Sequence, residues 1–439
     1  MKRIIAIILN LTLLMTCLAG CGKKQQETIL KIAALSSGYE AAKAGMWQEV
    51  CDAFTQQTGI KTKLTLEKNL EDTISASMQG GDYPDVVMLA TGREAALTEQ
   101  FIADKNLLEL TSVLDITVPG ESKKVREKLS GGFTDSSLTN PYGDGKTYLM
   151  PMFYSPCGLF YNKGLFESKG WQVPKTWQEM WDLGDKAKKE NIHLFTYPTT
   201  GYFDTFFYAL VYSVGGADFF NKVTNYEKGI WETDKGETVL NIITKLAEYT
   251  NPKTPAQAND QDFTKNQLLV MQNEALFMPN GSWIVGEMAD AKAADGFAWG
   301  MTALPAIKDG GERYSYTWLE QIWVPKGARN SEEAKKFIAF LYSDKACEIF
   351  SSRGAVQPVS GIAEKLSGDN KMFYSVYDDG AKAAMGGFAA YKSVAGLGKV
   401  GDYFFEPVNS LVSGKITAEK YKKDIIAATD KMRENLIKQ

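Results

Sequence analysis

Residues able to carry out covalent or metal chemistry are sparse in this sequence. The one histidine, His193, stands in an apolar, strand-like stretch, and we expect it to be packed or hydrogen-bonded rather than to act as a base or a metal ligand. No H-E-x-x-H, paired C-x-x-C or calcium-loop pattern occurs. Schemes that need two imidazoles are excluded, and we expect no enzyme, no cofactor and no metal site.

One phosphate-binding pattern occurs in an unsuitable context. Residues 396–401 satisfy G-x-G-x-x-G, but no predicted strand precedes them. The next six residues end in Pro407 and are a poor beginning for the long helix that a dinucleotide site requires. We therefore do not expect dinucleotide binding.

The most specific reactive residue is Cys21. A basic pair precedes an apolar run, residues 4–15, which is too short to cross a hydrocarbon core of about 30 Å. Residues 18–21, Leu-Ala-Gly-Cys, resemble the lipobox of bacterial lipoproteins, which implies cleavage before Cys21 and lipid attachment to its sulfur. We expect a signal peptide at residues 1–20 and a tether at residues 21–27. An ordinary signal peptide with an incidental cysteine is the alternative.

Composition indicates a large globular chain. It has 439 residues, 44% apolar and 12% aromatic, more than one hydrophobic core usually serves, so we expect two domains. The formal charge is -4 and no long basic stretch occurs, which makes nucleic acid a poor partner. Three cysteines follow the lipobox: Cys51, Cys157 and Cys347. We expect them to be buried as small apolar side chains. An odd number does not form a disulfide framework, but one disulfide between two of them is the alternative.

The elements that must position any site alternate between strands and helices. Residues 29–35, 60–66 and 86–89 have the apolar or alternating pattern of strands. Helical patterns lie between them, the first closed by Gly59 and the second ending near Met78. This order predicts a parallel sheet with right-handed crossovers, in which ligands bind at the carboxyl ends of the strands.

A second lobe is expected to begin at about residues 150–155. Residues 158–163 are strand-like, and Thr176 is a predicted helix N-cap with Glu179 at the capping-box position. Asn330 opens a further helix with one apolar face.

Several motifs follow one another in a characteristic order along the chain. They are residues 81–87, GDYPDVV; 159–163, LFYNK; 173–177, VPKTW; 274–283, EALFMPNGSW; and the helix 334–341 with Arg353 and Gly354 after it. In their order and spacing they resemble the bacterial extracellular solute-binding proteins of family 1, the sugar-capturing lipoproteins of ABC importers. Segments 153–155 and 201–204, rich in aromatic residues, resemble the subgroup that takes N-acetylglucosamine-type or other oligosaccharides.

The resemblance implies an α/β fold of two lobes, the type II periplasmic-binding-protein fold. Each lobe would be a mainly parallel sheet flanked by helices, and strands would cross between the lobes at a hinge. The first lobe would comprise residues 28–152 and 303–345, and the second residues 153–302 and 346–439. Segments 153–158 and 300–305 would be the hinge strands.

Sugar capture needs flat aromatic rings for the faces of the sugar and polar groups for its rim. The resemblance places Trp283 on the second lobe, facing the cleft, where it would stack on the ligand; a core tryptophan is the alternative. Tyr202 is expected to contact the ligand, with Asp204 as an acceptor, and surface packing is its alternative. Further stacking candidates, for which burial within a lobe is the alternative, are Tyr154, Trp231 and Trp318.

The expected polar rim combines a guanidinium with carboxylates and a hydroxyl. Arg93 follows a predicted strand, where its forked donors could hold neighbouring hydroxyls or an acetamido oxygen. A surface salt bridge with Glu94 or another neighbour is the alternative. The other rim candidates are Ser37, Glu67 and Glu320.

These implications make the chain a non-catalytic, monomeric receptor. It would deliver carbohydrate, expected to be an oligosaccharide, to an ABC permease at the extracellular face of the bacterial cytoplasmic membrane, anchored at Cys21. Two alternatives remain open. A secreted glycoside hydrolase needs two carboxyls about 5–10 Å apart, and a lipid-anchored sensor or adhesin would use the same fold without import.

Overall fold

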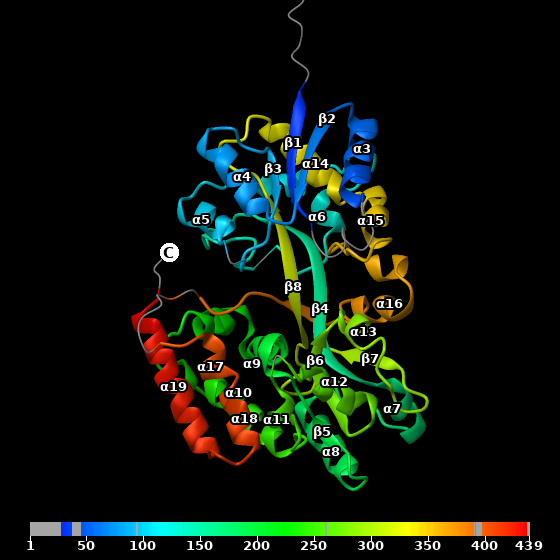
Figure 1. Cartoon of the computed structure of the whole chain (residues 1–439), viewed down its shortest axis with the longest axis vertical. Helices are drawn as coiled ribbons and strands as arrows, with labels where there is room; N and C mark the ends of the chain where they lie inside the picture. Colours follow the sequence, from blue (N-terminus) through cyan, green and yellow to red (C-terminus); the bar gives the residue numbers. More distant parts are fainter. Residues whose placement is uncertain are drawn as a thin grey trace, which may run out of the picture.

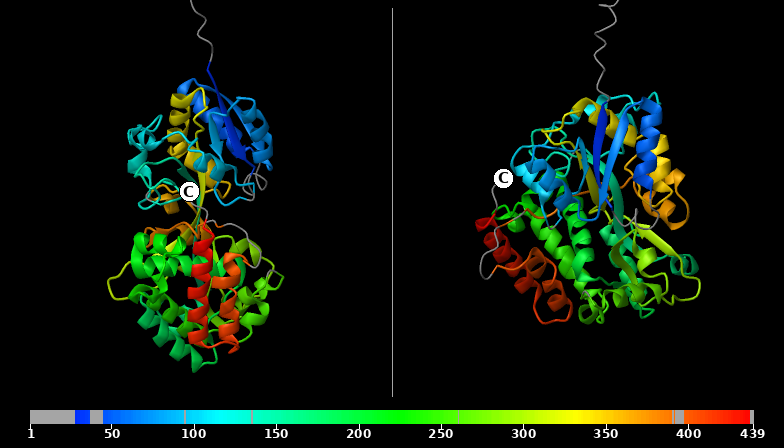
Figure 2. Two further views of the ribbon diagram at one scale, coloured as in Figure 1. Left: turned by 90° about the vertical axis from the view of Figure 1, so that its left-hand side faces the viewer. Right: turned by 45° about the horizontal axis from the view of Figure 1, so that its top comes forward.

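Two bodies joined by long strands make up the molecule. The computed structural model describes residues 28–36, 45–93, 95–134, 136–259, 261–389, 391 and 397–436; the predicted signal peptide, tether, Cys21 and Ser37 lie outside this part. Figure 1 shows an upper and a lower body, with β4 (Met150–Asn162) and β8 (Tyr314–Trp323) passing between them. In the side view of Figure 2 the bodies stay separate above and below this waist.

The upper body contains the predicted parallel strands. β1 (Ile29–Leu35) pairs in parallel with β2 (Lys61–Glu67) on one side and with β3 (Val86–Met88) on the other. Their carboxyl ends therefore share one edge of the sheet, and in Figure 1 this edge faces the waist. The helices of this body are α3 (Met46–Thr58), α4 (Leu70–Gln79), α5 (Leu97–Ala103), α6 (Val125–Lys128), α14 (Ser331–Leu341) and α15 (Asp344–Ser351), with the 3-10 turn η1 (Thr111–Asp115).

The sheet continues through the waist, and its pairing changes there. The strand order is β2-β1-β3-β8-β4-β6-β5, with β6 (Ala275–Gly281) and β5 (His193–Phe195) in the lower body. β3 with β8, β8 with β4 and β4 with β6 are all antiparallel. The sheet is thus mixed rather than mainly parallel in both lobes, because β4 and β8 traverse the waist in opposite directions.

The two predicted hinge segments occupy different places. Residues 153–158 lie within β4, which crosses the waist. Residues 300–305 overlap β7 (Trp299–Thr302), which pairs with the lower end of β4, whereas β8 makes the second crossing. A third connection includes β9 (Lys382–Ala384), which pairs in parallel with β8.

The lower body packs helices on both faces of its strands. α9 (Asp204–Thr224) covers one face, and α12 (Phe263–Met271) and α16 (Gly368–Tyr374) lie on the other. At the start of α8 (Trp177–Lys188), Thr176 Oγ1 accepts from the N–H of Glu179 at 3.3 Å, as the predicted N-cap requires. The remaining helices are α7 (Lys163–Lys169), α10 (Asp234–Glu248), α11 (Thr254–Gln257), α13 (Ile284–Glu287), α17 (Val400–Phe404), α18 (Pro407–Val412) and α19 (Ala418–Glu434).

One predicted lobe boundary can be compared with the helices of the structure. The boundary between residues 345 and 346 falls inside α15, and α15 packs against α3 of the upper body. α17, α18 and α19 contact one another and pack with the lower-body core. The assignment of residues to lobes remains a prediction.

The remaining cysteines form no disulfide among the residues that the structure describes. Cys51, Cys157 and Cys347 are free and buried, in keeping with their predicted packing role. Over the residues that the structure describes, no helix combines the length and the apolar character needed to cross a membrane.

Candidate ligand-binding site

The candidate site is built on one face of β8. Side chains alternate along a strand, so Tyr316, Trp318 and Glu320 share a face. The Tyr316 and Trp318 rings meet edge to face, with centroids 5.7 Å apart. Trp318 is 45% exposed, although most large apolar side chains of the described chain are buried. An indole left open in the middle of a strand that joins the two bodies is an apolar surface available to a ligand.

Neighbouring strands extend this face toward Trp283. Ser155 and Cys157 of β4 lie opposite Trp318 and Tyr316, and Gly281 of β6 lies opposite Cys157. The Trp283 ring occupies the space above Gly281, where an added Cβ would fall 2.2 Å from indole atoms. Glycine is therefore required at 281 for Trp283 to take this position.

Tyr202 is fixed beside Trp283 by a partly buried chain of polar side chains. Its ring centroid lies 6.4 Å from that of Trp283, and its hydroxyl donates to Glu287 Oε1 at 2.8 Å. Gln267 Nε2 donates to the other carboxylate oxygen of Glu287 at 2.7 Å. The ring also stacks on Phe263 at 5.7 Å. Burial, followed by the bond to Glu287, raises the pKa of Tyr202, so the phenol stays neutral.

Asp204 lies at the Tyr316 end of this face. It is the first residue of α9, and its Oδ1 accepts from the N–H of Thr205 at 2.8 Å. Its charge acts on Cys157, Tyr208 and Tyr316, so the carboxyl lies near these three side chains. Burial raises the pKa of Asp204 to about 6, although backbone hydrogen bonds oppose the shift.

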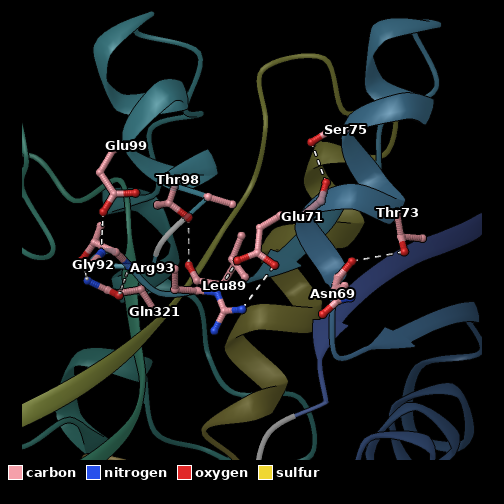
Figure 3. Close-up of polar contacts among 12 residues, drawn as sticks. Asn69, Glu71, Thr73, Ser75, Leu89, Gly92, Arg93, Thr98, Glu99 and Gln321 are labelled. Carbon is pink, nitrogen blue, oxygen red and sulfur yellow. Dashed lines mark hydrogen bonds and ion pairs between the residues drawn. The ribbon is translucent and has the colours of Figure 1, made fainter.

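Arg93 lies at the other end and already has a partner. Its guanidinium forms a two-point ion pair with Glu71 of α4, with Nε bonded to Oε1 and Nη2 donating to Oε2 at 3.3 Å (Figure 3). Burial would raise the pKa of Glu71, but the hydrogen bond and charge of Arg93 hold it below its ordinary value. Arg93 thus forms a salt bridge with Glu71 of another element, and Glu94 lies outside the described residues.

Glu320 carries an unsatisfied carboxyl oxygen on the same face of β8 as Trp318. Its Oε2 is shielded from solvent and has no hydrogen-bond partner. Burial raises the pKa of Glu320 to about 7, even though the positive charge of Arg93 lowers it. A carboxyl in this state can accept a donor from outside the protein.

The other predicted contacts are placed elsewhere. Glu67 is exposed at the end of β2, on the same sheet edge as Arg93 but with β1 between them. Tyr154 points to the opposite face of the sheet, where it packs on Phe133, and Trp231 is buried in the lower body with Nε1 donating to Thr429 Oγ1 at 2.7 Å. The structure brings six of the predicted residues to one face: Arg93, Tyr202, Asp204, Trp283, Trp318 and Glu320.

Two further residues lie at this face, and of these Tyr208 was not anticipated in the sequence. Tyr208 lies one helical turn after Asp204, and its ring stacks on Tyr316 at 5.3 Å. The N–H of Phe388, from the third connection between the bodies, donates to the Tyr208 hydroxyl at 3.4 Å. The i, i+4 spacing of Asp204 and Tyr208 was a usable signal, whereas the approach of residue 388 depends on tertiary structure.

A separate cavity lies at the β9 edge of the waist. It has a volume of about 540 Å³ and is lined by Tyr212, Tyr314, Tyr377 and Asp378, among others, but by none of the six residues brought together on β8. Its Tyr377 hydroxyl is already bonded to Thr317 Oγ1. We therefore place the candidate site at Trp318 and Glu320, where an open ring and an unpartnered acceptor occur together.

Metal chemistry finds no support in the described residues. No group of three or more His, Cys, Asp and Glu side chains there could hold a metal ion. His193 begins β5, where burial lowers its pKa.

Comparison with known proteins identifies relatives over most of the length of this chain. A family model described as "Bacterial extracellular solute-binding protein" matches residues 49–365. The diacetylchitobiose-binding protein NgcE of Streptomyces coelicolor is 27% identical over 306 residues, which cover 68% of this chain and 62% of the relative. The chain thus spans a little under two thirds of that relative. The galactooligosaccharide-binding protein of Bacillus subtilis is 23% identical over 338 residues, covering 75% of this chain and 74% of the relative.

Solved structures share the fold. The bacterial solute receptor AcbH, described as preferring β-D-galactopyranose, superposes with a TM-score of 0.70 at 20% identity, covering 93% of this chain and all of the receptor. Apo RafE of Streptococcus pneumoniae gives a TM-score of 0.66 at 16% identity and covers 94% of this chain and all of RafE. These likenesses confirm the predicted two-lobed type II fold.

Proposed function

Since this chain belongs to the bacterial extracellular solute-binding protein family, we propose that it is a receptor that binds carbohydrate and delivers it to an ABC importer. The family consists of solute receptors rather than enzymes, and the predicted membership is confirmed. Relatives named for diacetylchitobiose and galactooligosaccharide support a carbohydrate, and in particular an oligosaccharide. The observation that carries the proposal is the exposed Trp318 ring beside the unpartnered carboxyl of Glu320.

The proposed site offers both kinds of contact that a sugar needs. The indoles of Trp318 and Trp283 provide flat apolar surfaces for the faces of sugar rings. Glu320 and Asp204 accept from ring hydroxyls, and Arg93 donates to ring oxygens. Because Arg93 belongs to the upper body and Asp204 to the lower, a bound sugar would favour approach of the two bodies over the open arrangement.

The family supports export of the protein, and Cys21 supports a lipid anchor. Membership in an extracellular family implies an exported protein. We propose in addition that Cys21 carries the lipid that holds the receptor, as a monomer, at the outer face of the cytoplasmic membrane. Labelled palmitate should enter the wild-type protein and not the C21A variant, which should appear in the medium. Equal labelling of both would contradict the anchor.

Replacement of Trp283 tests the proposed function. Trp283→Ala should weaken sugar binding by about 1.5–3 kcal/mol, the value of burying one large apolar side chain, or roughly ten- to a hundredfold in Kd. A thermal-shift screen of mono- and oligosaccharides supplies the ligand, and calorimetry measures the affinity.

The matched control is Trp171→Ala. Trp171 packs on Phe166 of the lower body and belongs to no part of the proposed site, so its loss should leave affinity within about twofold of wild type. Unchanged affinity in Trp283→Ala would remove that residue from the site. If no sugar in the screen bound, the carbohydrate proposal itself would fail.

A further inference from the structure

We infer that Glu320 determines specificity by requiring a hydrogen-bond donor from the sugar ring that lies on Trp318, and that it accepts this bond as a carboxylate, so that binding releases a proton. The inference rests on the proposed carbohydrate function and concerns the same site. It adds a chemical requirement on the ligand and a dependence of affinity on pH.

The geometry of β8 places the two groups within reach of one sugar ring. Trp318 and Glu320 are two residues apart on one face, a distance of about 7 Å along a strand. A ring stacked on the indole therefore brings a hydroxyl of its rim toward the carboxyl. Glu320 Oε2 is shielded and unpartnered, so it is an acceptor that the protein itself leaves unused.

The charged groups around Glu320 come from both bodies. Arg93 acts on it from the upper body, but the Nε and Nη2 donors of that guanidinium are bonded to Glu71. From the lower body, Asp204 lies at the far end of the face, over Tyr316. On the opposite face of β8, Gln321 is bonded to Thr91.

Glu320 is therefore about half protonated at pH 7 in the free protein. Burial raises the pKa of this carboxyl to about 7, because the ionised form lacks a donor of its own. A ligand hydroxyl changes this balance, since hydrogen bonds to a carboxylate are stronger than those to a neutral acceptor. On binding, the O–H bond of the Glu320 carboxyl breaks, the proton passes to the buffer, and the carboxylate accepts from the sugar.

Linkage gives the size of the effect. If the bound sugar holds Glu320 ionised, affinity is nearly constant above pH 8, is about half its limiting value at pH 7, and falls about tenfold for each pH unit well below pH 7. Between pH 8 and pH 6 the loss is about tenfold. Asp204, with a pKa of about 6, titrates lower and adds about a further factor of two over that interval if its carboxylate is also favoured.

Calorimetry of the sugar found in the thermal-shift screen tests proton release directly. Titrations at pH 7 in phosphate and in Tris, which differ in ionisation enthalpy, give the number of protons exchanged. Wild type should release about half a proton, because half of Glu320 is protonated at that pH. The Glu320→Gln variant should release none, and its affinity should vary less than about threefold from pH 6 to pH 8.

Glu348→Gln is the matched control, because Glu348 is an exposed glutamate of α15 that pairs with Lys345. It should behave as wild type. Asp204→Asn should keep most of the change between pH 6 and pH 8, which separates the two carboxyls. If Glu320→Gln does not fold by circular dichroism, the wild-type and Asp204→Asn titrations still decide whether a proton leaves at pH 7.

Deoxy analogues of the same sugar test the specificity claim. Removal of one particular hydroxyl should weaken wild-type binding at least about tenfold at pH 8 and weaken Glu320→Gln binding clearly less. Equal losses in both proteins for every analogue would overturn this assignment. Proton uptake, or the same release in wild type and Glu320→Gln, would overturn the linkage. Absence of binding by any sugar would contradict the proposed function rather than the role of Glu320 alone.

Discussion

Polar side chains on one face of β8 are hydrogen-bonded within the protein, whereas Glu320 on the other face keeps an oxygen without a partner. On the sealed face, Gln321 is fully buried; its Nε2 donates to Thr91 Oγ1 at 3.1 Å and its Oε1 accepts from the Thr91 N–H at 3.1 Å. Thr317 on the same face bonds the Tyr377 hydroxyl. On the open face, Glu320 Oε2 has no partner and Trp318 is exposed.

This difference separates groups that hold the waist together from groups that we propose to contact a ligand. A buried polar group that is hydrogen-bonded stabilises one arrangement, whereas an unsatisfied one costs free energy until a partner arrives. Residues adjacent along one strand therefore take opposite roles, decided by which face they occupy.

The largest expected effect is on the sealed face. Gln321→Ala removes the bonds to Thr91 and a further one to the carbonyl of Leu138 at 3.3 Å, and it leaves buried groups unpaired. The free energy of unfolding should fall by about 3 kcal/mol, measured by urea denaturation. A loss below about 1 kcal/mol would mean that this face does not hold the waist.

On the open face, Trp318→Ala should show the reverse pattern. Sugar affinity should fall by about 2 kcal/mol, because a stacking surface is lost. The free energy of unfolding should change by less than about 1 kcal/mol, because the ring is already half-exposed. Calorimetry and urea denaturation on the same preparation give both values. A stable protein with unchanged affinity would place the ligand away from this face.

The smallest effect compares Glu320 with Glu71 by stability at two pH values. A folded-state pKa raised to about 7 means that Glu320 stabilises the fold at low pH and that this contribution is lost as pH rises through 7. Without ligand, Glu320→Gln should therefore exceed wild type by about 1 kcal/mol at pH 8, after allowance for partial exposure, and the gap should close by pH 5.

Glu71 should behave in the opposite sense. Its pKa is lowered, so its contribution is present above the unfolded-state pKa, and Glu71→Gln should lower stability at pH 8. Melting temperatures of the two variants at pH 5 and pH 8 check both signs. If the melting temperatures of both variants shifted in the same direction relative to wild type at pH 8, the predicted opposite signs for Glu320 and Glu71 would be wrong.

Local periodicity was enough to predict much of the upper body. Residues 29–35 form β1, and Gly59 ends α3 with φ 77 and its N–H bonded to the carbonyl of Thr55. The helix expected after Asn330 is α14. In each case, the pattern of apolar residues and the end signal lie within one short segment, so no distant contact was needed to recognise them.

Contacts between distant segments could not be predicted from local sequence patterns. The sequence named Glu320 as a candidate but did not show that its strand would cross the waist, because strand partners are chosen by tertiary packing. Arg93 and Glu71 are 22 residues apart and meet only once α4 packs on the sheet, against β1 and β2. The residues gathered on β8 were candidates by type, and the ligand contact of each remains a prediction.

Gly281 shows how the position of an aromatic ring can depend on a missing atom. The Trp283 indole rests where any side chain at 281 would have to be, so a single methyl group added to the strand would tilt the ring without touching a sugar. If the proposed function holds, variation at this one position of β6 would change which glycans are accepted while every residue proposed to contact them stays the same.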